Sequence, residues 1–296
     1  MDASLLSAYF GLDDAFPSAL EPLCPGATGQ DGMPVIFSHE LDPSTVQAGD
    51  FVITNVEGEE SKPLCSTFRP AIDGGELRTV LLVGQFGTAA LTQVCVVGDI
   101  WDKCHRVSFQ GQCVQPKPVT GVPAFVLAEE ILQNVTCPEG SSERAIRVTW
   151  DAGVTLPNAT PVTGNASVHY SVTMKDGSVV TPSALVDLED RDNNHLLCFH
   201  DTPTGESSWE ATSVSFEAGH LTDPNEDGTN LETTVNVVQF IKCGSPPPVP
   251  MEADGSGSGS GSSGGVPSSS GVVPIHVSFS WIWLTGLVLL HMIRHK

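Results

Sequence analysis

The sequence is poor in basic residues. Its 296 residues include 13 Lys and Arg against 35 Asp and Glu, which gives a formal net charge of −22. Proteins that bind nucleic acids need Lys and Arg to displace the counterions of the phosphate backbone. The composition therefore argues against a nucleic-acid partner, and it favours solubility and the binding of cations.

The motifs of common enzymes and cofactor sites are also missing. The sequence has no G-x-S-x-G nucleophile elbow, phosphate-binding loop, dinucleotide fingerprint or C-x-x-C zinc pattern. A Ser/His/Asp triad can still assemble from distant positions, so catalysis stays open. We expect a binding or structural role rather than an enzymatic one.

Helical periodicity is scarce, and short apolar runs between turn signals are frequent. Asp176-Gly177, between two alternating runs, is a hairpin signal. Regular short strands of this kind predict an all-β fold with two Ig-like β-sandwich domains in tandem. The predicted strands are 34–37, 50–54, 62–69, 77–86, 93–99, 145–150, 167–174, 178–180, 195–199, 213–217 and 233–240. Helical turns are expected only at 5–10 and 126–133.

A Pro-rich stretch, Gln115 to Pro123, is the best internal boundary. We predict a first β-sandwich with an N-terminal extension at residues 1–118 and a second at 119–244. A flexible Gly/Ser/Pro linker follows at 245–274, and a hydrophobic segment at 275–296.

One segment of the first domain resembles a known family. Val35-Ile-Phe-Ser-His-Glu-Leu-Asp-Pro-Ser-Thr-Val46, followed by Asp50-Phe-Val-Ile-Thr54, resembles the opening of bacterial Ig-like domains of the surface-layer type. The match covers about residues 33 to 100. The resemblance implies a structural or adhesive module of a cell-surface protein, without catalytic residues. The cysteine content departs from that family.

The hydrophobic C-terminal segment has two interpretations. Val277 to Ile293 is about 17 residues long, the short end of what spans a bilayer, and Arg294 and Lys296 would suit a cytoplasmic end. Alternatively, the small residues at 262–264, the polar spacer and the apolar tail form a GPI-anchor signal. Both interpretations attach the protein to a membrane, either as a single-pass or as a GPI-anchored protein.

Residues 1–20 do not form a signal peptide, because they lack a basic region and Asp2, Asp13 and Asp14 interrupt the apolar residues. Two features nevertheless place the domains outside the cell: eight cysteines, and three glycosylation sequons at Asn134, Asn158 and Asn165. We infer that the chain is a mature fragment or a sequence that has lost its signal, and we predict a glycoprotein of the cell surface.

The cysteines divide into five before the internal boundary and three after it, so at least one disulfide must cross it if all eight pair. Eight cysteines allow 105 connectivities. The short separation of Cys104 and Cys113 around a Phe-Gln-Gly turn predicts that these two form a bridge.

Two acidic stretches are candidate calcium sites. Asp223-Pro-Asn-Glu-Asp-Gly228 has the D-x-N-x-D-G beginning of a calcium loop, with Asp223, Asn225 and Asp227 as ligands. The twelfth position is Thr234 rather than Glu, so the loop is not an EF-hand. Asp190 and Asp192 belong to the second stretch. Both stretches are equally typical of solvated turns.

The histidines offer one weaker candidate. His195 and His200, with Asp192 and Asp201 nearby, have the residue types of a metal or acid–base site.

The sequence as a whole predicts a surface-anchored structural or adhesive ectodomain that calcium could stabilise. Its partners would be the membrane, through the C-terminal segment, and an unidentified extracellular protein or glycan. An extracellular hydrolase, or an accessory domain of one, is the alternative function.

The linker generates the first testable prediction. Residues 247–270 contain almost no apolar side chains, so protease should cut this stretch before any other. Limited proteolysis followed by mass spectrometry measures the order of cleavage. First cuts within residues 50–86, with the linker intact, would contradict the prediction.

Overall fold

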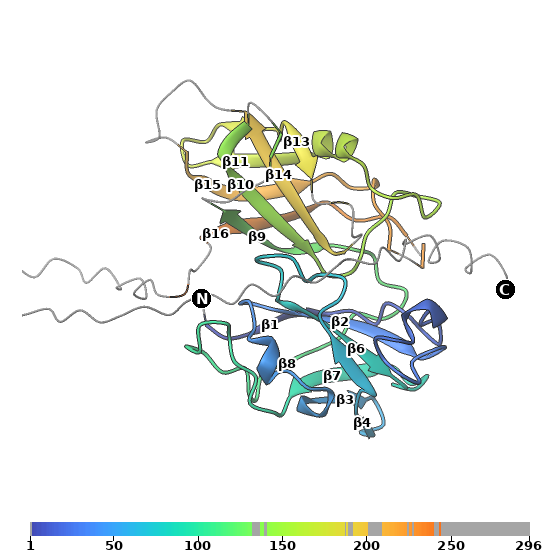
Figure 1. The fold of residues 1–296 in the computed structure, drawn as a ribbon. Helices are drawn as coiled ribbons and strands as arrows, with labels where there is room; N and C mark the ends of the chain where they lie inside the picture. The colour runs from blue at the N-terminus through green and yellow to red at the C-terminus, as the bar shows by residue number, and fades with distance from the viewer. Residues whose placement is uncertain are drawn as a thin grey trace, which may run out of the picture. The chain divides into compact units, whose positions relative to one another are not determined.

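Short strands joined by turns make up nearly all of the regular structure (Figure 1). The computed structural model describes residues 2–131, 137–138, 141–186, 188, 192–200, 209–223, 225–226, 228–239 and 243. The predicted linker at 245–274 and the hydrophobic segment at 275–296 lie outside these residues. Within the described ranges, no helix has the length and apolar character that a membrane span requires.

The all-β prediction is confirmed, and each of the eleven predicted strand regions contains an observed strand. The 3-10 helices are η1 (Ser18–Leu20), η2 (Pro43–Thr45), η3 (Ala48–Asp50) and η4 (Gly164–His169). The Asp176-Gly177 hairpin is also confirmed, because it joins β11 to β12 and Gly177 adopts a φ of 84°.

The strands before residue 115 form two four-stranded sheets with the orders β1-β2-β6-β5 and β4-β3-β7-β8. We call these strands the N-terminal set. They are β1 (Leu5–Ala8), β2 (Asp31–Phe37), β3 (Phe51–Asn55), β4 (Glu60–Ser61), β5 (Cys65–Thr67), β6 (Thr79–Gly84), β7 (Leu91–Val96) and β8 (Cys113–Val114).

The strands after residue 124, the C-terminal set, form one sheet with the order β12-β11-β15-β16-β9-β10-β14-β13. They are β9 (Phe125–Ile131), β10 (Ser141–Trp150), β11 (Tyr170–Met174), β12 (Val179–Val180), β13 (Ala184–Val186), β14 (Asn194–His200), β15 (Ala211–Phe216) and β16 (Thr233–Gln239). The stretch predicted as a boundary, 115–123, lies between the two sets.

Both sets have the same connectivity among the strands described. In each, the first strand pairs with the second, the second with the sixth, and the sixth with the fifth. The fourth pairs with the third, the third with the seventh, and the seventh with the eighth. In the C-terminal set the eighth strand also pairs in parallel with the first. A parallel bridge between Tyr9 and Lys117 lies at the corresponding place in the N-terminal set.

Each set of strands encloses its own aromatic core. Phe37 packs edge-on against Phe51 and Phe109 in the N-terminal set. Trp150 packs against Phe125 and Phe216 in the C-terminal set. The two separate cores follow from the alternation of buried and exposed side chains along strands such as β3.

Two predicted helical turns are wrong, because both segments are strands. Residues 5–8 form β1, which pairs with β2, and residues 125–131 form β9, which pairs with β10 and β16. The Leu-Ala-Glu-Glu sequence of β9 favours a helix locally. Sheet pairing on both sides of β9 overrides this preference. Both acidic side chains also have partners in the fold: Glu129 contacts Arg78, and Glu130 contacts Arg144 and Gln239.

The predicted Cys104–Cys113 disulfide is also wrong. Cys113 pairs with Cys95, which lies directly opposite it on the neighbouring strand with a Cα–Cα distance of 4.1 Å. Cys104 pairs with Cys243, and this bridge joins the two halves of the chain as the odd cysteine counts require. The other disulfides are Cys24–Cys65 and Cys137–Cys198, so all eight cysteines are paired.

Buried polar groups connect the two sets of strands. Arg78, just before β6, forms an ion pair with Glu129 of β9 at 2.6 Å, and both side chains are almost fully buried. Arg147 of β10 donates from Nη2 to the carbonyl oxygen of Gly74 at 2.8 Å and lies 3.7 Å from Glu76. Lys117 forms an ion pair with the buried carboxylate of Asp151. Residues of both sets therefore supply the partners of these charges.

Gly75 generates a stability prediction. Its φ is 100°, and a Cβ atom there would overlap Nη1 of Arg147, whose side chain is buried against the same loop. Gly75→Ala should therefore lower the free energy of unfolding by more than the roughly 1–2 kcal/mol that a left-handed backbone alone costs. Denaturant unfolding measures the loss.

Gly58→Ala is the matched control, because Gly58 has a φ of 80° and no atom within 4 Å of the added Cβ. It should show the backbone cost without the overlap. Equal losses for the two variants would contradict a packing role for Arg147 beside Gly75.

Candidate functional site

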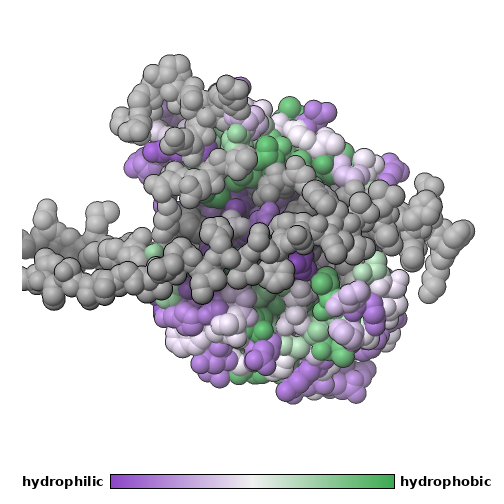
Figure 2. Space-filling model, in the orientation of Figure 1, coloured by the Kyte–Doolittle hydropathy of each residue, from purple (hydrophilic) through white to green (hydrophobic). Residues whose placement is uncertain are grey.

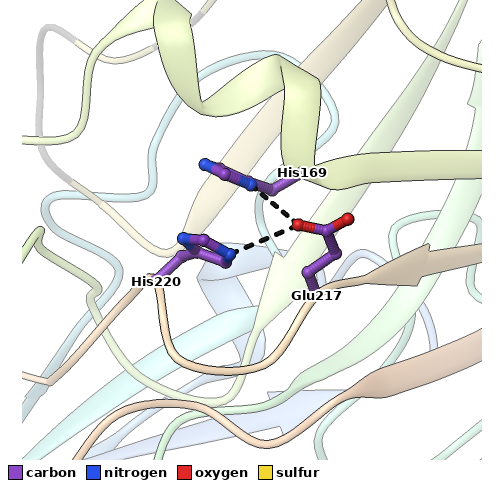
Figure 3. Close-up of side chains that lie close together, drawn as sticks. All are labelled: His169, Glu217 and His220. Atoms are coloured by element: carbon purple, nitrogen blue, oxygen red, sulfur yellow. Dashed lines mark hydrogen bonds and ion pairs between the residues drawn. The ribbon is translucent and has the colours of Figure 1, made fainter.

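Three side chains that could hold a metal ion meet at one end of the sheet of the C-terminal set, beside the start of β11 and the end of β15. His169 Nδ1 lies 3.0 Å from Oε2 of Glu217, and His220 Nε2 lies 3.3 Å from the same oxygen (Figure 3). The two imidazole rings stack with their centroids 3.5 Å apart. We call these three residues the His–Glu–His cluster.

The register of two paired strands brings the cluster together. Tyr170 of β11 faces Phe216 of β15, so the neighbouring His169 and Glu217 lie opposite one another. The Glu217 backbone N–H extends this ladder by donating to the His169 carbonyl oxygen at 3.1 Å. His220 follows three residues later, after a turn in which Gly219 adopts a φ of 90°.

Glu217 carries the charge of the cluster. Hydrogen bonding from His169 is the main cause that lowers the pKa of the Glu217 carboxyl, and His220 adds to it. The carboxylate is therefore ionised at neutral pH. Two imidazole nitrogens and one carboxylate oxygen are donors that suit divalent transition metals and zinc.

The sequence analysis missed this cluster. The three positions are separated by 48 and 3 residues, and no short motif joins them. The one local signal is the Glu-x-x-His spacing of 217–220, which falls in a turn rather than on a helix. Only the strand register adds His169.

A second acidic group, Asp13, Asp14 and Asp31, also has its carboxylate oxygens close together. The buried Asp31 accepts hydrogen bonds from the backbone N–H groups of Asp14 at 2.9 Å and Phe86 at 2.7 Å, one on each oxygen. Burial raises the pKa of Asp31. These bonds assign Asp31 a role in fixing the loops beside β2.

The predicted calcium ligands of the first acidic stretch lie in contact with the N-terminal set. Asp223 is fully buried and accepts a hydrogen bond from the Tyr9 hydroxyl, while Asn225 donates to the Gly11 carbonyl oxygen at 2.6 Å. Asp227 lies outside the described residues. The structure thus gives Asp223 and Asn225 a structural role in joining the two sets, and calcium binding there stays a prediction.

The second acidic stretch is described only in part. Asp192 is buried and accepts hydrogen bonds from the backbone and side-chain N–H groups of Asn194 at 2.6 and 2.9 Å. Asp190 lies outside the described residues, as does Asp201. Among the residues described, neither predicted calcium stretch contributes to a group of three His, Cys, Asp or Glu side chains whose ligand atoms lie close together.

His195 and His200 point to different environments. His195 is buried in the core, and His200 at the other end of β14 is exposed. Trp150 donates from Nε1 to the Tyr170 hydroxyl at 3.1 Å, and that hydroxyl lies 2.8 Å from Nδ1 of His195. The indole can only donate, so His195 Nδ1 is the acceptor available to the Tyr170 O–H, and this favours an imidazole that carries its proton on Nε2.

Two of the three predicted glycosylation sites are described, and both are exposed. Asn158 lies in a turn with a φ of 66°, and Asn165 lies in η4. Asn134 lies outside the described residues. Glycosylation of all three stays a prediction.

Comparison with known proteins adds little to this geometry. No protein-family model matches the chain, and no curated protein sequence matches it. Three solved structures of the bacterial S-layer protein SbsC have TM-scores of 0.27, 0.29 and 0.29 and identities of 14%, 13% and 12%. The alignments cover 80–81% of this chain but only 41–44% of those chains.

His195 generates a prediction about pH. Burial lowers its pKa from 6.5 to about 3, so the unfolded chain takes up a proton below pH 6.5 that the folded chain refuses. The stability that the neutral imidazole contributes is complete above pH 6.5. It is lost at roughly 1.4 kcal/mol per pH unit as the pH falls towards 3.

Denaturant unfolding of the wild type and of His195→Gln between pH 7.5 and 4.5 measures this contribution. It is the difference between the two proteins in the slope of unfolding free energy against pH. In the wild type, NMR should show no titration of the His195 ring above pH 4.5. A ring that titrates near pH 6.5 would contradict the prediction.

Proposed function

We propose that the protein is a structural or adhesive ectodomain of a cell surface, built from two Ig-like sandwiches. The observation that carries this proposal is that all eight cysteines are paired in four disulfides. Disulfides form and persist in secreted and extracellular proteins, whereas the cytosol keeps thiols reduced. The pairing supports an oxidising compartment.

The strand order supports the Ig-like assignment. In the N-terminal set, strands one, two, six and five form one sheet, and strands four, three, seven and eight form another; in the C-terminal set the same two groups are joined into one sheet by the pairing of strands eight and one. This is the arrangement of Ig-type sandwiches, whose two sheets contain strands A, B, E, D and strands C′, C, F, G. The proposed domains span residues 1–118 and 119–244.

The connection between the two sandwiches supports a mechanical role. Buried ion pairs and the Cys104–Cys243 disulfide link the sandwiches, so a load applied to one is transmitted to the other. Residues 275–296 attach this unit to a membrane, as a spanning helix or through a GPI anchor. An extracellular protein or glycan is the partner class.

The polarity of the surface and the net charge of the chain are both consistent with an extracellular setting. Figure 2 shows hydrophilic residues spread over the visible face, with hydrophobic residues interspersed among them. The net charge of −22 gives the protein solubility outside the cell, where salt screens the repulsion between its carboxylates. No specific contact among the described residues favours the alternative function, an extracellular hydrolase, and it stays a prediction.

Differential alkylation of the protein from its native source tests the location. Thiols are blocked before reduction and counted again after reduction, under denaturing conditions. We expect fewer than one blocked thiol per chain and eight new thiols after reduction. Protease treatment of intact cells should also release fragments of residues 2–243.

Seven or eight thiols blocked before reduction would place the domains in a reducing compartment and overturn the proposal. Fragments released only after cell lysis would do the same. A cytosolic protein carried through the same steps is the control for cell integrity.

A further inference from the structure

Two of the three separations in the His–Glu–His cluster are close to those of a metal site, and all three ligand atoms lie within 4.8 Å of one another. In tetrahedral coordination with bonds of 2.0–2.1 Å, neighbouring ligand atoms lie about 3.3 Å apart. The distances from Oε2 of Glu217 to the two imidazole nitrogens are 3.0 and 3.3 Å. In Figure 3 both rings turn a nitrogen towards this one oxygen.

The turn that carries two of the three ligands is held by Asn230, which is almost fully buried. Its Oδ1 accepts from the backbone N–H groups of His220 at 3.0 Å and Leu221 at 2.9 Å. Its Nδ2 donates to the carbonyl oxygen of Glu217 at 2.7 Å. One side chain therefore fixes both ends of the turn at 217–220.

The two imidazole rings are also held in place by packing against the core. His169 and His220 both pack edge-on against Phe216, which is fully buried in the core. Ordering long or mobile side chains costs free energy on binding. Packing and the Glu217 hydrogen bonds meet part of that cost by ordering the rings in the folded protein, but the rings are stacked at an interplanar angle of 19°, so one of them has to turn to direct its nitrogen at a shared ion.

The outer side of the cluster is open to solvent. The Glu217 side chain is 65% exposed, and those of His169 and His220 are 28% and 35% exposed. An ion can therefore enter and keep a water molecule as its fourth ligand. The net charge of −22 raises the local concentration of cations around the protein.

We propose that His169, Glu217 and His220 bind one divalent ion of the zinc class, with water in the fourth position. Two imidazoles and one carboxylate suit Zn²⁺, Cu²⁺ or Ni²⁺, whereas Ca²⁺ and Mg²⁺ take sets of oxygen ligands. This site is independent of the predicted calcium stretches and of the proposed function.

Isothermal titration of the full chain with zinc chloride tests the proposal. We expect one tight site in the wild type. His220→Gln and His169→Gln should each weaken the binding of that ion by on the order of 100-fold, because each removes one of three ligands. In the same titration with calcium chloride, the heat of binding should be the same for the wild type and for the two variants.

His105→Gln is the matched control. His105 is also exposed, and its Nε2 lies 2.6 Å from a carboxylate oxygen of Asp42. This ion pair contains one histidine, whereas the His–Glu–His cluster contains two. It should leave the stoichiometry and affinity unchanged. Equal zinc binding in the wild type and in the double variant His169→Gln/His220→Gln would overturn the proposal, as would the absence of binding in the wild type at millimolar zinc.

A second measurement uses only the wild type, and so does not depend on the folding of the variants. Diethylpyrocarbonate modifies accessible imidazole nitrogens, and mass spectrometry locates the modified residues. One equivalent of zinc should protect His169 and His220 while leaving His105 reactive. Unchanged reactivity of His169 and His220 would overturn the proposal.

Discussion

The buried ion pair between Arg78 and Glu129 is the contact on which the arrangement of the two strand sets depends. Burial raises the pKa of Glu129, and the guanidinium groups of Arg78 and Arg147 oppose this shift. Arg78 also donates to the Ser38 carbonyl oxygen at 3.1 Å. Removing either side chain would leave the other charge buried without its partner, which typically costs about 3–5 kcal/mol. Residues 1–243 accordingly form one compact unit.

Other contacts between the sets are also polar. Tyr9 donates to Asp223 and lies 2.8 Å from the Gly121 carbonyl oxygen, and Asn193 donates to Thr79 at 3.0 Å. Hydrogen bonds are directional, so they specify one orientation more strictly than an apolar contact of the same area. The residues with the sequence features of a calcium loop contribute to this orientation.

The same strand order in both sets explains why the candidate metal ligands occur where they do. The third and seventh strands of a sandwich are neighbours, so the residues just before one and just after the other meet at one end of the sheet. In the C-terminal set these residues are His169 and Glu217. The position of His220 then depends on Gly219 and Asn230, which shape the turn after β15.

The sequence by itself determined the all-β class, eleven of the strand regions and the need for a disulfide across the boundary, because these follow from local alternation and from counting cysteines. Only the tertiary structure decided that residues 5–8 and 125–131 are strands, since pairing with neighbours outweighs the local helix preference. It also decided that Cys104 pairs with Cys243, and that His169 meets Glu217 and His220. Those contacts join positions far apart in the chain, and strand register creates proximity that sequence spacing does not show.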